Sequence, residues 1–212
     1  MQRKYSKEEL KNKLHRSLYT VVMKEGIEGV TVRKISNTSE LSDPYIYQCY
    51  KNLREMMQSA FLEIDTEVTE LVEHLVKSET FIAKMETNPK QCCWMMWNVY
   101  WKFLMEDPEK TVFYWRYYQS AHYTKEFLET RRDVLKPFIE YMEKLEKKLG
   151  IREQMDTEVL VSNMIDSTVS VAVKMHLGYI KQSDLKAYTL YQSIFALFFH
   201  LMHVDVWTEA CS

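Results

Sequence analysis

Glycine and proline are scarce in this chain, with four of each among 212 residues. These residues end helices and form tight turns, so their scarcity favours long helices with few connections. The four cysteines are Cys49, Cys92, Cys93 and Cys211. They show neither a C-x-x-C spacing nor histidines at the intervals of a zinc site. The simplest interpretation is free thiols in a reduced, cytoplasmic protein.

Long hydrophobic runs are also absent. The longest, Ile194 to Phe199, has six residues, whereas a helix needs about 20 apolar residues to span a bilayer. The first nine residues are too polar for a signal peptide. We therefore expect neither secretion nor membrane insertion.

Apolar side chains are abundant, and their share of 46% is enough for a sizeable core. The length fits one long domain or two small ones. The net charge of −2 is unevenly distributed, because residues 1–60 carry +4 and the remainder carries −6. This asymmetry indicates a small domain that meets nucleic acid and a larger one with another role. Chance clustering of charges on solvated faces is the alternative.

Apolar residues recur at helical spacing and predict an all-α fold of about nine helices. The clearest helix spans residues 7–25, with Leu10, Leu14 and Leu18 on one face and Gly26 as its stop. A long helix from residue 53 to about 77 joins the small domain to the large one. Two more helices are expected to begin at residues 31 and 42. The remaining helices are expected over residues 89–105, 107–121, 124–150, 156–179 and 183–206.

Residues 31–57 have the outline of a helix-turn-helix. The first helix opens at Thr31, whose hydroxyl suits an N-cap, and Leu41 fills the turn. Ser42 is expected to cap the second helix, with Ile46 and Tyr50 facing inward. The outward side then carries three side chains long enough to reach a phosphate or a base edge, namely Tyr45, Tyr47 and Gln48.

The segment resembles the tetracycline-repressor (TetR) family of bacterial transcriptional regulators. The matching positions are Gly26, Thr31, Val32, Ile35, Leu41, Ser42, Ile46, Tyr47 and Tyr50. The chain departs from the family at Glu40, where a glycine is usual and a left-handed backbone is expected, and at Leu53, where the family has a phosphate-binding lysine. Cys49 replaces a histidine.

The resemblance implies a DNA-binding domain over residues 1–52 and a ligand-binding and dimerisation domain over 53–212. It implies phosphate contacts from Thr31, Arg33, Tyr47, Gln48 and Lys51, and base contacts from Tyr45 and Ser42. Arg33 and Lys34 support this interpretation, because cations in the first turn of a helix oppose its dipole and helix stability does not explain them.

Aromatic side chains concentrate between residues 94 and 118. Trp94, Trp97 and Trp101 repeat at helical spacing and share a face. An ordinary core is one interpretation. The resemblance implies the other, an effector pocket for a small apolar or aromatic molecule, lined by Trp94, Trp97, Tyr100, Trp101, Trp115 and Tyr118.

The last two expected helices carry apolar residues on more than one side, including Val159, Met164, Leu190 and Phe198. One apolar face can pack into the core of the subunit, and the other has to be buried against another surface. The resemblance implies a homodimer through these helices, which places two recognition helices one DNA turn apart. A monomer with central C-terminal helices is the alternative.

The sequence contains no set of residues typical of an enzyme active site. His200 and His203 have only Asp205 nearby as a third metal ligand. We therefore expect no cofactor and no catalysis. The predicted function is that of a ligand-responsive transcriptional regulator, with repression favoured over activation. The alternative is a relative with an altered DNA surface that acts through protein contacts, favoured by Glu40, Asp43 and Leu53. A small helical enzyme is the weaker alternative.

Overall fold

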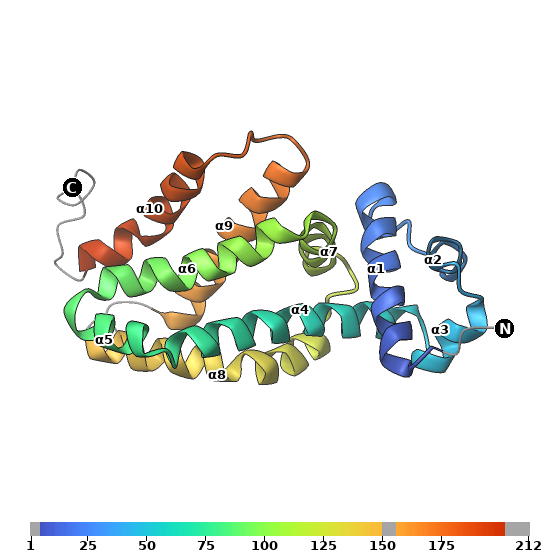
Figure 1. Cartoon of the computed structure of the whole chain (residues 1–212), viewed down its shortest axis with the longest axis horizontal. Helices are drawn as coiled ribbons and strands as arrows, with labels where there is room; N and C mark the ends of the chain where they lie inside the picture. Colours follow the sequence, from blue (N-terminus) through green and yellow to red (C-terminus); the bar gives the residue numbers. More distant parts are fainter. Residues whose placement is uncertain (1–4, 150–155, 202–212) are drawn as a thin grey trace. The chain divides into compact units, whose positions relative to one another are not determined.

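The computed structural model describes residues 5–149 and 156–201. Every regular element in these residues is an α-helix (Figure 1), which confirms the all-α prediction. No helix among them is long and apolar enough to cross a membrane. The ten helices are α1 (Lys7–Glu25), α2 (Val32–Ser39), α3 (Asp43–Cys49), α4 (Leu53–Val76), α5 (Glu79–Thr87), α6 (Pro89–Glu106), α7 (Pro108–Tyr118), α8 (Lys125–Leu149), α9 (Thr157–His176) and α10 (Asp184–Leu201).

Helix α5 is not among the helices that the sequence predicts. It begins after Ser78, whose hydroxyl accepts a hydrogen bond from the Phe81 N–H at 3.3 Å. Phe81 is its one buried residue, so nine residues offer no repeating apolar pattern. The helix depends on its N-cap and on the core that receives Phe81.

The chain divides into two compact units, the first of residues 1–67 and 106–134 and the second of residues 68–105 and 135–212. Two boundaries fall inside α4 and α8, so each of these helices belongs partly to both units, and the third falls before Glu106, the last residue of α6. The first half of α4 and all of α7 thus belong to the first unit, together with α1, α2 and α3. The functional division at residue 52 stays a prediction.

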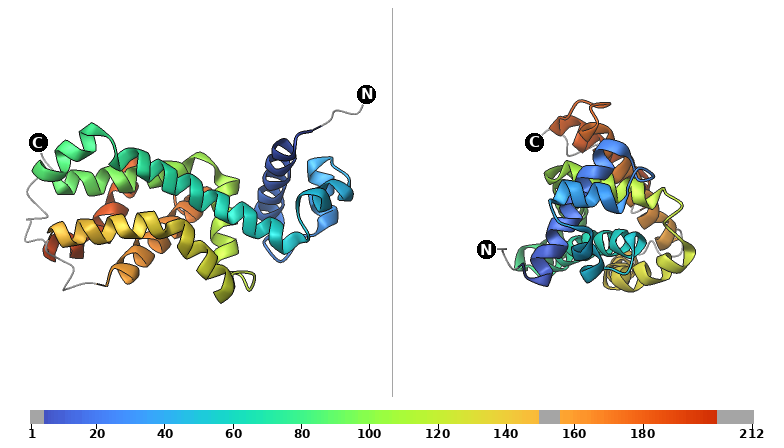
Figure 2. Two further views of the ribbon diagram at one scale, coloured as in Figure 1. Left: turned by 90° about the horizontal axis from the view of Figure 1, so that it is seen from below. Right: turned by 90° about the vertical axis from the view of Figure 1, so that its right-hand side faces the viewer.

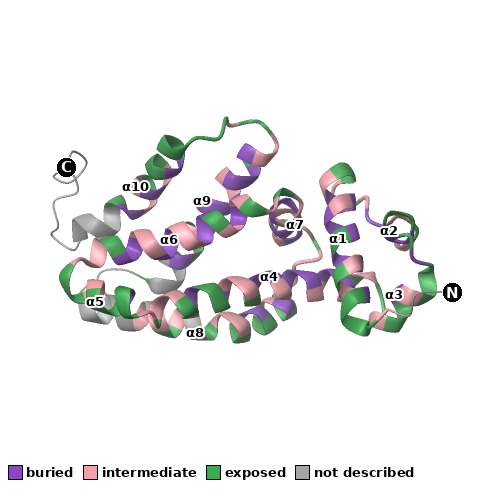
Figure 3. Cartoon of the chain, viewed as in Figure 1, coloured by how far each residue is buried: buried purple, intermediate pink, exposed green. Residues whose placement is uncertain are grey.

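Helix α1 organises the first unit and contacts α2, α3 and α7. The three N-terminal helices, coloured blue, lie together in both views of Figure 2. Leu10, Leu14 and Leu18 are buried on one face of α1, where each contributes about 1.5–3 kcal/mol relative to exposure. Figure 3 shows buried residues recurring along α1. Ser6 and Glu9 form a capping box, and Gly26 ends α1 with a φ of 83°.

The second unit has its own apolar core. Its centre is a cluster contributed by α4, α5, α6 and α9, with Leu75, Met85 and Ile165 packed around it. Helix α10 contacts α9. The cluster consists of Val72, Phe81, Cys92, Met96 and Val161.

A buried ion pair joins three helices of the first unit. Arg131 of α8 donates from Nε to Asp65 Oδ2 of α4 at 2.8 Å, and Asp65 is 2% exposed. The Tyr114 hydroxyl of α7 donates to Asp65 Oδ1 at 2.6 Å. Four aromatic rings surround the guanidinium at 5.1 to 5.8 Å, those of Phe61, Tyr114, Tyr118 and Tyr123. The charges are therefore desolvated but well satisfied.

The Asp65→Asn substitution is expected to lower the free energy of unfolding by about 3–5 kcal/mol, because it leaves Arg131 as an uncompensated buried charge. Urea denaturation followed by circular dichroism measures the loss. The matched control is Glu73→Gln, whose partner Lys77 is 73% exposed and whose loss should stay below about 1 kcal/mol. Equal losses in the two variants would contradict the role assigned to the buried pair.

Candidate nucleic-acid interface

The helix-turn-helix is present in the first unit. The Thr31 hydroxyl accepts a hydrogen bond from the Lys34 N–H at 3.3 Å and caps α2 as expected. Glu40 ends α2 in the left-handed region, with φ 55° and ψ 28°. It is the one non-glycine residue with positive φ among those described, which confirms the backbone expected there. Leu41 is buried in the turn.

Helix α3 begins differently from the expectation. Ser42 occupies the N-cap position, but its side chain makes no capping hydrogen bond, so the cap assigned to it is wrong. The Asp43 carboxylate instead accepts a hydrogen bond from the Ser36 hydroxyl of α2. This contact ties the start of α3 to α2. Ile46 and Tyr50 are buried, as predicted.

Most of the seven residues predicted to contact DNA lie on the surface of the first unit. Tyr47 is 58% exposed, and Tyr45 is half-buried. The others are exposed, namely Thr31, Arg33, Ser42, Gln48 and Lys51. Figure 3 shows exposed segments on α2 and α3. The contacts themselves stay a prediction.

Lys34 needs no phosphate to explain it. Its ammonium forms an ion pair with Glu25 of α1 and donates to the Gly29 carbonyl at 2.8 Å. Contacts outside α2 therefore account for Lys34, and its presence in the first turn no longer supports a phosphate contact. Arg33 is exposed and forms no ion pair among the described residues. Arg33 is therefore the positively charged side chain of α2 that is available to bind a phosphate.

A chain of two hydrogen bonds, one buried and one part-buried, supports α3 from behind. His15 of α1 is 2% exposed; its Nδ1 lies 2.6 Å from Glu63 Oε2 of α4, and its Nε2 lies 2.7 Å from Tyr50 Oη. An ionised carboxylate only accepts, so Nδ1 carries the proton, and Nε2 shares the second hydrogen bond with the Tyr50 hydroxyl. The sequence signal was the position of His15 beside Leu14 on the buried face of α1, but its partners are 35 and 48 residues away.

The surroundings shift two pKa values in this chain of hydrogen bonds. The hydrogen bond from His15 lowers the pKa of the Glu63 carboxyl, and burial opposes it. Burial raises the pKa of Tyr50 to about 12. Tyr50 is therefore neutral and Glu63 ionised at neutral pH, which keeps the donors and acceptors in the order described.

The aromatic residues predicted to form an effector pocket fall in both units. In the second unit Trp97 stacks on Trp101, with ring centroids 5.4 Å apart and planes at 10°. Trp94 lies 5.4 Å from Trp97 and is half-buried. The Trp97 Nε1–H donates to the Thr168 hydroxyl at 3.1 Å. These rings, with buried Tyr100, pack as core side chains.

Trp115 and Tyr118 belong to α7 in the first unit. Their rings lie 6.0 Å apart, and Tyr118 faces the guanidinium of Arg131. The shared face of α6 was correctly inferred for its tryptophans. A role of all six aromatics in effector binding stays a prediction.

Solved structures with the same architecture were found. A TetR-family transcription regulator from Marinobacter aquaeolei VT8 has a TM-score of 0.71 at 13% identity, over 88% of this chain and 94% of that one. The fatty acid degradation regulator FadR from Bacillus halodurans has a TM-score of 0.65 at 17% identity, over 91% and 96%. The chain has the TetR fold. No family profile and no curated protein sequence matches it.

A third structure with the TetR fold is FadR from Bacillus subtilis in complex with stearoyl-CoA. Its TM-score is 0.64 at 16% identity, and the match covers 88% of this chain and 96% of that one. Identities this low establish a common fold, and the function has to be argued from residues.

No group of three or more histidine, cysteine or acidic side chains suited to a metal occurs in the described residues. His200, His203 and Asp205, the one metal constellation considered from the sequence, lie outside the described side chains. The geometry of this TetR fold instead presents an exposed polar face on α3, held by buried contacts.

The Glu63→Gln substitution is expected to make the free energy of unfolding depend less on pH at acidic pH. Because the folded pKa of Glu63 is lowered, its contribution is complete above the ordinary glutamate pKa of about 4.3 and is lost as the pH falls through the lower folded value. Urea unfolding at pH 6 to 3 measures this, with Glu70→Gln on the exposed side of α4 as control. A stability difference from wild type that does not shrink toward pH 3 would refute the linkage.

Glu40→Gly is expected to raise the free energy of unfolding by about 0.5–1 kcal/mol, because glycine adopts a φ of 55° without steric cost. Thr38→Gly, in the right-handed part of α2, should lower it by a similar amount. Thermal unfolding of both variants checks the pair. A loss of stability in Glu40→Gly would mean that the carboxylate makes a contact worth more than the strain.

Proposed function

We propose that the protein is a ligand-responsive transcriptional regulator, acting as a repressor, that binds a palindromic operator as a dimer. The observation that carries the proposal is the exposed face of α3, held by buried side chains in a unit with the TetR fold. A short helix with exposed polar side chains fits the major groove of DNA.

In this proposal α3 enters the major groove with Tyr45 and Ser42 toward the bases. Exposed donors around it suit the phosphates on either side of the groove. These donors are Thr31, Arg33, Tyr47, Gln48 and Lys51. The exposure of Tyr47 and Arg33 supports the assignment, and the exposed carboxylate of Glu40 reduces the positive charge available.

Dimerisation is proposed through α9 and α10. Val159 on α9 is 66% exposed, and Leu185 on α10 is 75% exposed. Apolar side chains this exposed favour a partner surface. The side chain of Phe198, which the same prediction used, lies outside those described. A dimer would place two α3 helices about 34–36 Å apart, one turn of DNA.

The effector is proposed to be a small, largely apolar or aromatic molecule that acts at the aromatic side chains of α6 in the second unit. Support comes from the complex of the Bacillus subtilis FadR, a protein of the same fold, with stearoyl-CoA, a ligand that includes a long apolar acyl chain. Because Trp97 and Trp101 stack closely, binding requires these rings to separate. Continuous α4, from Leu53 to Val76, would transmit the displacement to the first unit and release DNA.

Glu40 also favours a second function, regulation through protein contacts by a chain that has lost DNA affinity. Its carboxylate is exposed at the turn, where repulsion by phosphates is expected. The two functions differ in one measurable property, which is salt-sensitive binding to duplex DNA.

Tyr47→Ala is expected to reduce affinity for DNA from upstream of the protein's own gene at least tenfold, because it removes an exposed contact without disturbing the core. Gel retardation at two salt concentrations measures the change. The control is Tyr179→Ala, which removes a 79% exposed tyrosine between α9 and α10 and should bind as wild type does.

Retention of full affinity by Tyr47→Ala, with wild-type binding intact, would remove α3 from the interface. Absence of any retardation by the folded wild-type protein would favour the protein-contact function or a distant operator.

A further inference from the structure

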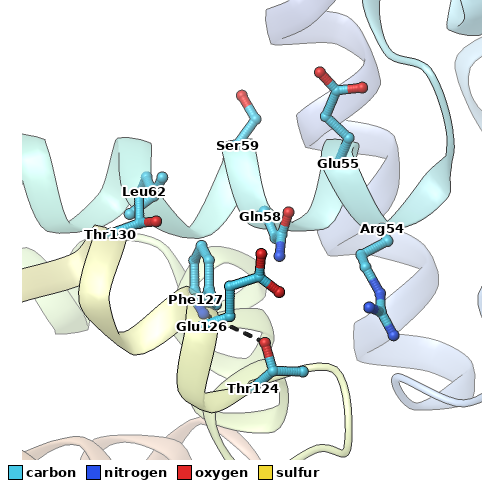
Figure 4. Close-up of a pocket in the computed structure, with 9 residues that line it drawn as sticks. All are labelled: Arg54, Glu55, Gln58, Ser59, Leu62, Thr124, Glu126, Phe127 and Thr130. Carbon is cyan, nitrogen blue, oxygen red and sulfur yellow. Dashed lines mark hydrogen bonds between the residues drawn. The ribbon is translucent and has the colours of Figure 1, made fainter.

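A polar groove of about 540 Å³ lies between the beginning of α4 and the beginning of α8, wholly within the first unit (Figure 4). None of the six aromatic residues assigned to the effector lines it. Helix α4 contributes Arg54, Gln58 and Leu62, and helix α8 contributes Glu126 and Phe127. The groove therefore offers a separate binding place in the unit that carries α3.

Two opposite charges face this groove from different helices. In Figure 4 the Arg54 side chain descends from α4 at one end of the groove, and the Glu126 carboxylate extends from α8 toward Gln58. Both residues are exposed, and neither forms an ion pair within the described part of the chain. Glu55, the other acid of the groove, accepts a hydrogen bond from the Lys51 N–H at 2.6 Å.

An apolar surface completes the groove. Phe127 is buried, and its ring packs edge-on against Phe61 and Tyr117, with centroids 5.7 and 5.6 Å away. Leu62 lines the same space from α4. Packing against these two rings fixes the Phe127 ring, so the apolar surface is formed before any ligand arrives.

We propose that this groove binds a small zwitterion, an α-amino acid with an apolar side chain. The ligand carboxylate matches the planar fork of the Arg54 guanidinium, the ammonium pairs with Glu126, and the side chain covers Leu62 and Phe127. A polyanion would meet the Glu126 carboxylate. An uncharged apolar molecule would desolvate both charges without compensation.

The groove adjoins residues that hold α3. Ser59, which also lines it, lies near Tyr50, which follows the last residue of α3, and opposes the rise in the pKa of the Tyr50 hydroxyl. The next turn of α4 carries Glu63, the partner of His15. A ligand that draws the first turns of α4 toward α8 therefore acts on the support of α3. An effect on operator affinity follows from this coupling and rests on the proposed function; the binding itself does not.

Isothermal titration calorimetry of the full chain tests the site with L-leucine, L-methionine and L-phenylalanine. At least one of them should bind saturably. Two probes that each lack one charge, 4-methylpentanoate and 3-methylbutylamine, should bind at least tenfold more weakly than leucine if leucine is the ligand. Binding of none of the three amino acids, or equal binding of a singly charged probe, would overturn the proposal.

Substitutions locate the site. Arg54→Gln and Glu126→Gln should each lower the affinity at least tenfold, with melting temperatures unchanged because both side chains are exposed. Lys125→Gln and Glu129→Gln, exposed charges at the start of α8 that do not line the groove, should bind as wild type does. Equal losses in Glu129→Gln and Glu126→Gln would overturn the assignment. Binding without any change in gel retardation would retain the site and refute its coupling to α3.

Discussion

The position of the candidate DNA-reading helix depends on one buried side chain, His15. Helix α3 has seven residues, too few for a helix to be stable on its own. It is held by burial of Ile46 and Tyr50, and the Tyr50 hydroxyl is fixed by the His15 ring, which Glu63 fixes in turn. Each hydrogen-bonding group has one partner of the right kind, so the orientation of α3 against α1 and α4 is specified by chemistry as well as by shape.

The ion pair of Asp65 and Arg131 does the same for the helices behind this assembly. A buried ion pair adds little net stability compared with apolar packing, but a misplaced partner is costly, so it selects one arrangement of α4, α7 and α8. Phe61 contacts both the Arg131 guanidinium and the Phe127 ring. The proposed amino-acid groove and the support of α3 therefore share the same stretch of α4.

The sequence predicted what local patterns determine. Helical periodicity identified the face of α1, and the turn chemistry located Glu40 at a left-handed backbone. It failed where the partner belongs to another helix or to a connecting loop: Lys34 is explained by Glu25 of α1 and by Gly29, and Asp43 by Ser36 of α2. The six aromatics were grouped by sequence proximity, but tertiary packing assigns them to two units. The groove was not predicted, because it joins residues about 70 positions apart that carry no motif.

The most direct measurement is selection of binding sites from a random library of duplex DNA by the full-length protein, with sequencing of the retained fraction. The account predicts enriched inverted repeats whose half-sites are centred about one helical turn apart, some 10 base pairs, with enrichment that weakens as salt is raised. A folded protein that enriches no sequence would contradict the claim that the α3 face reads DNA.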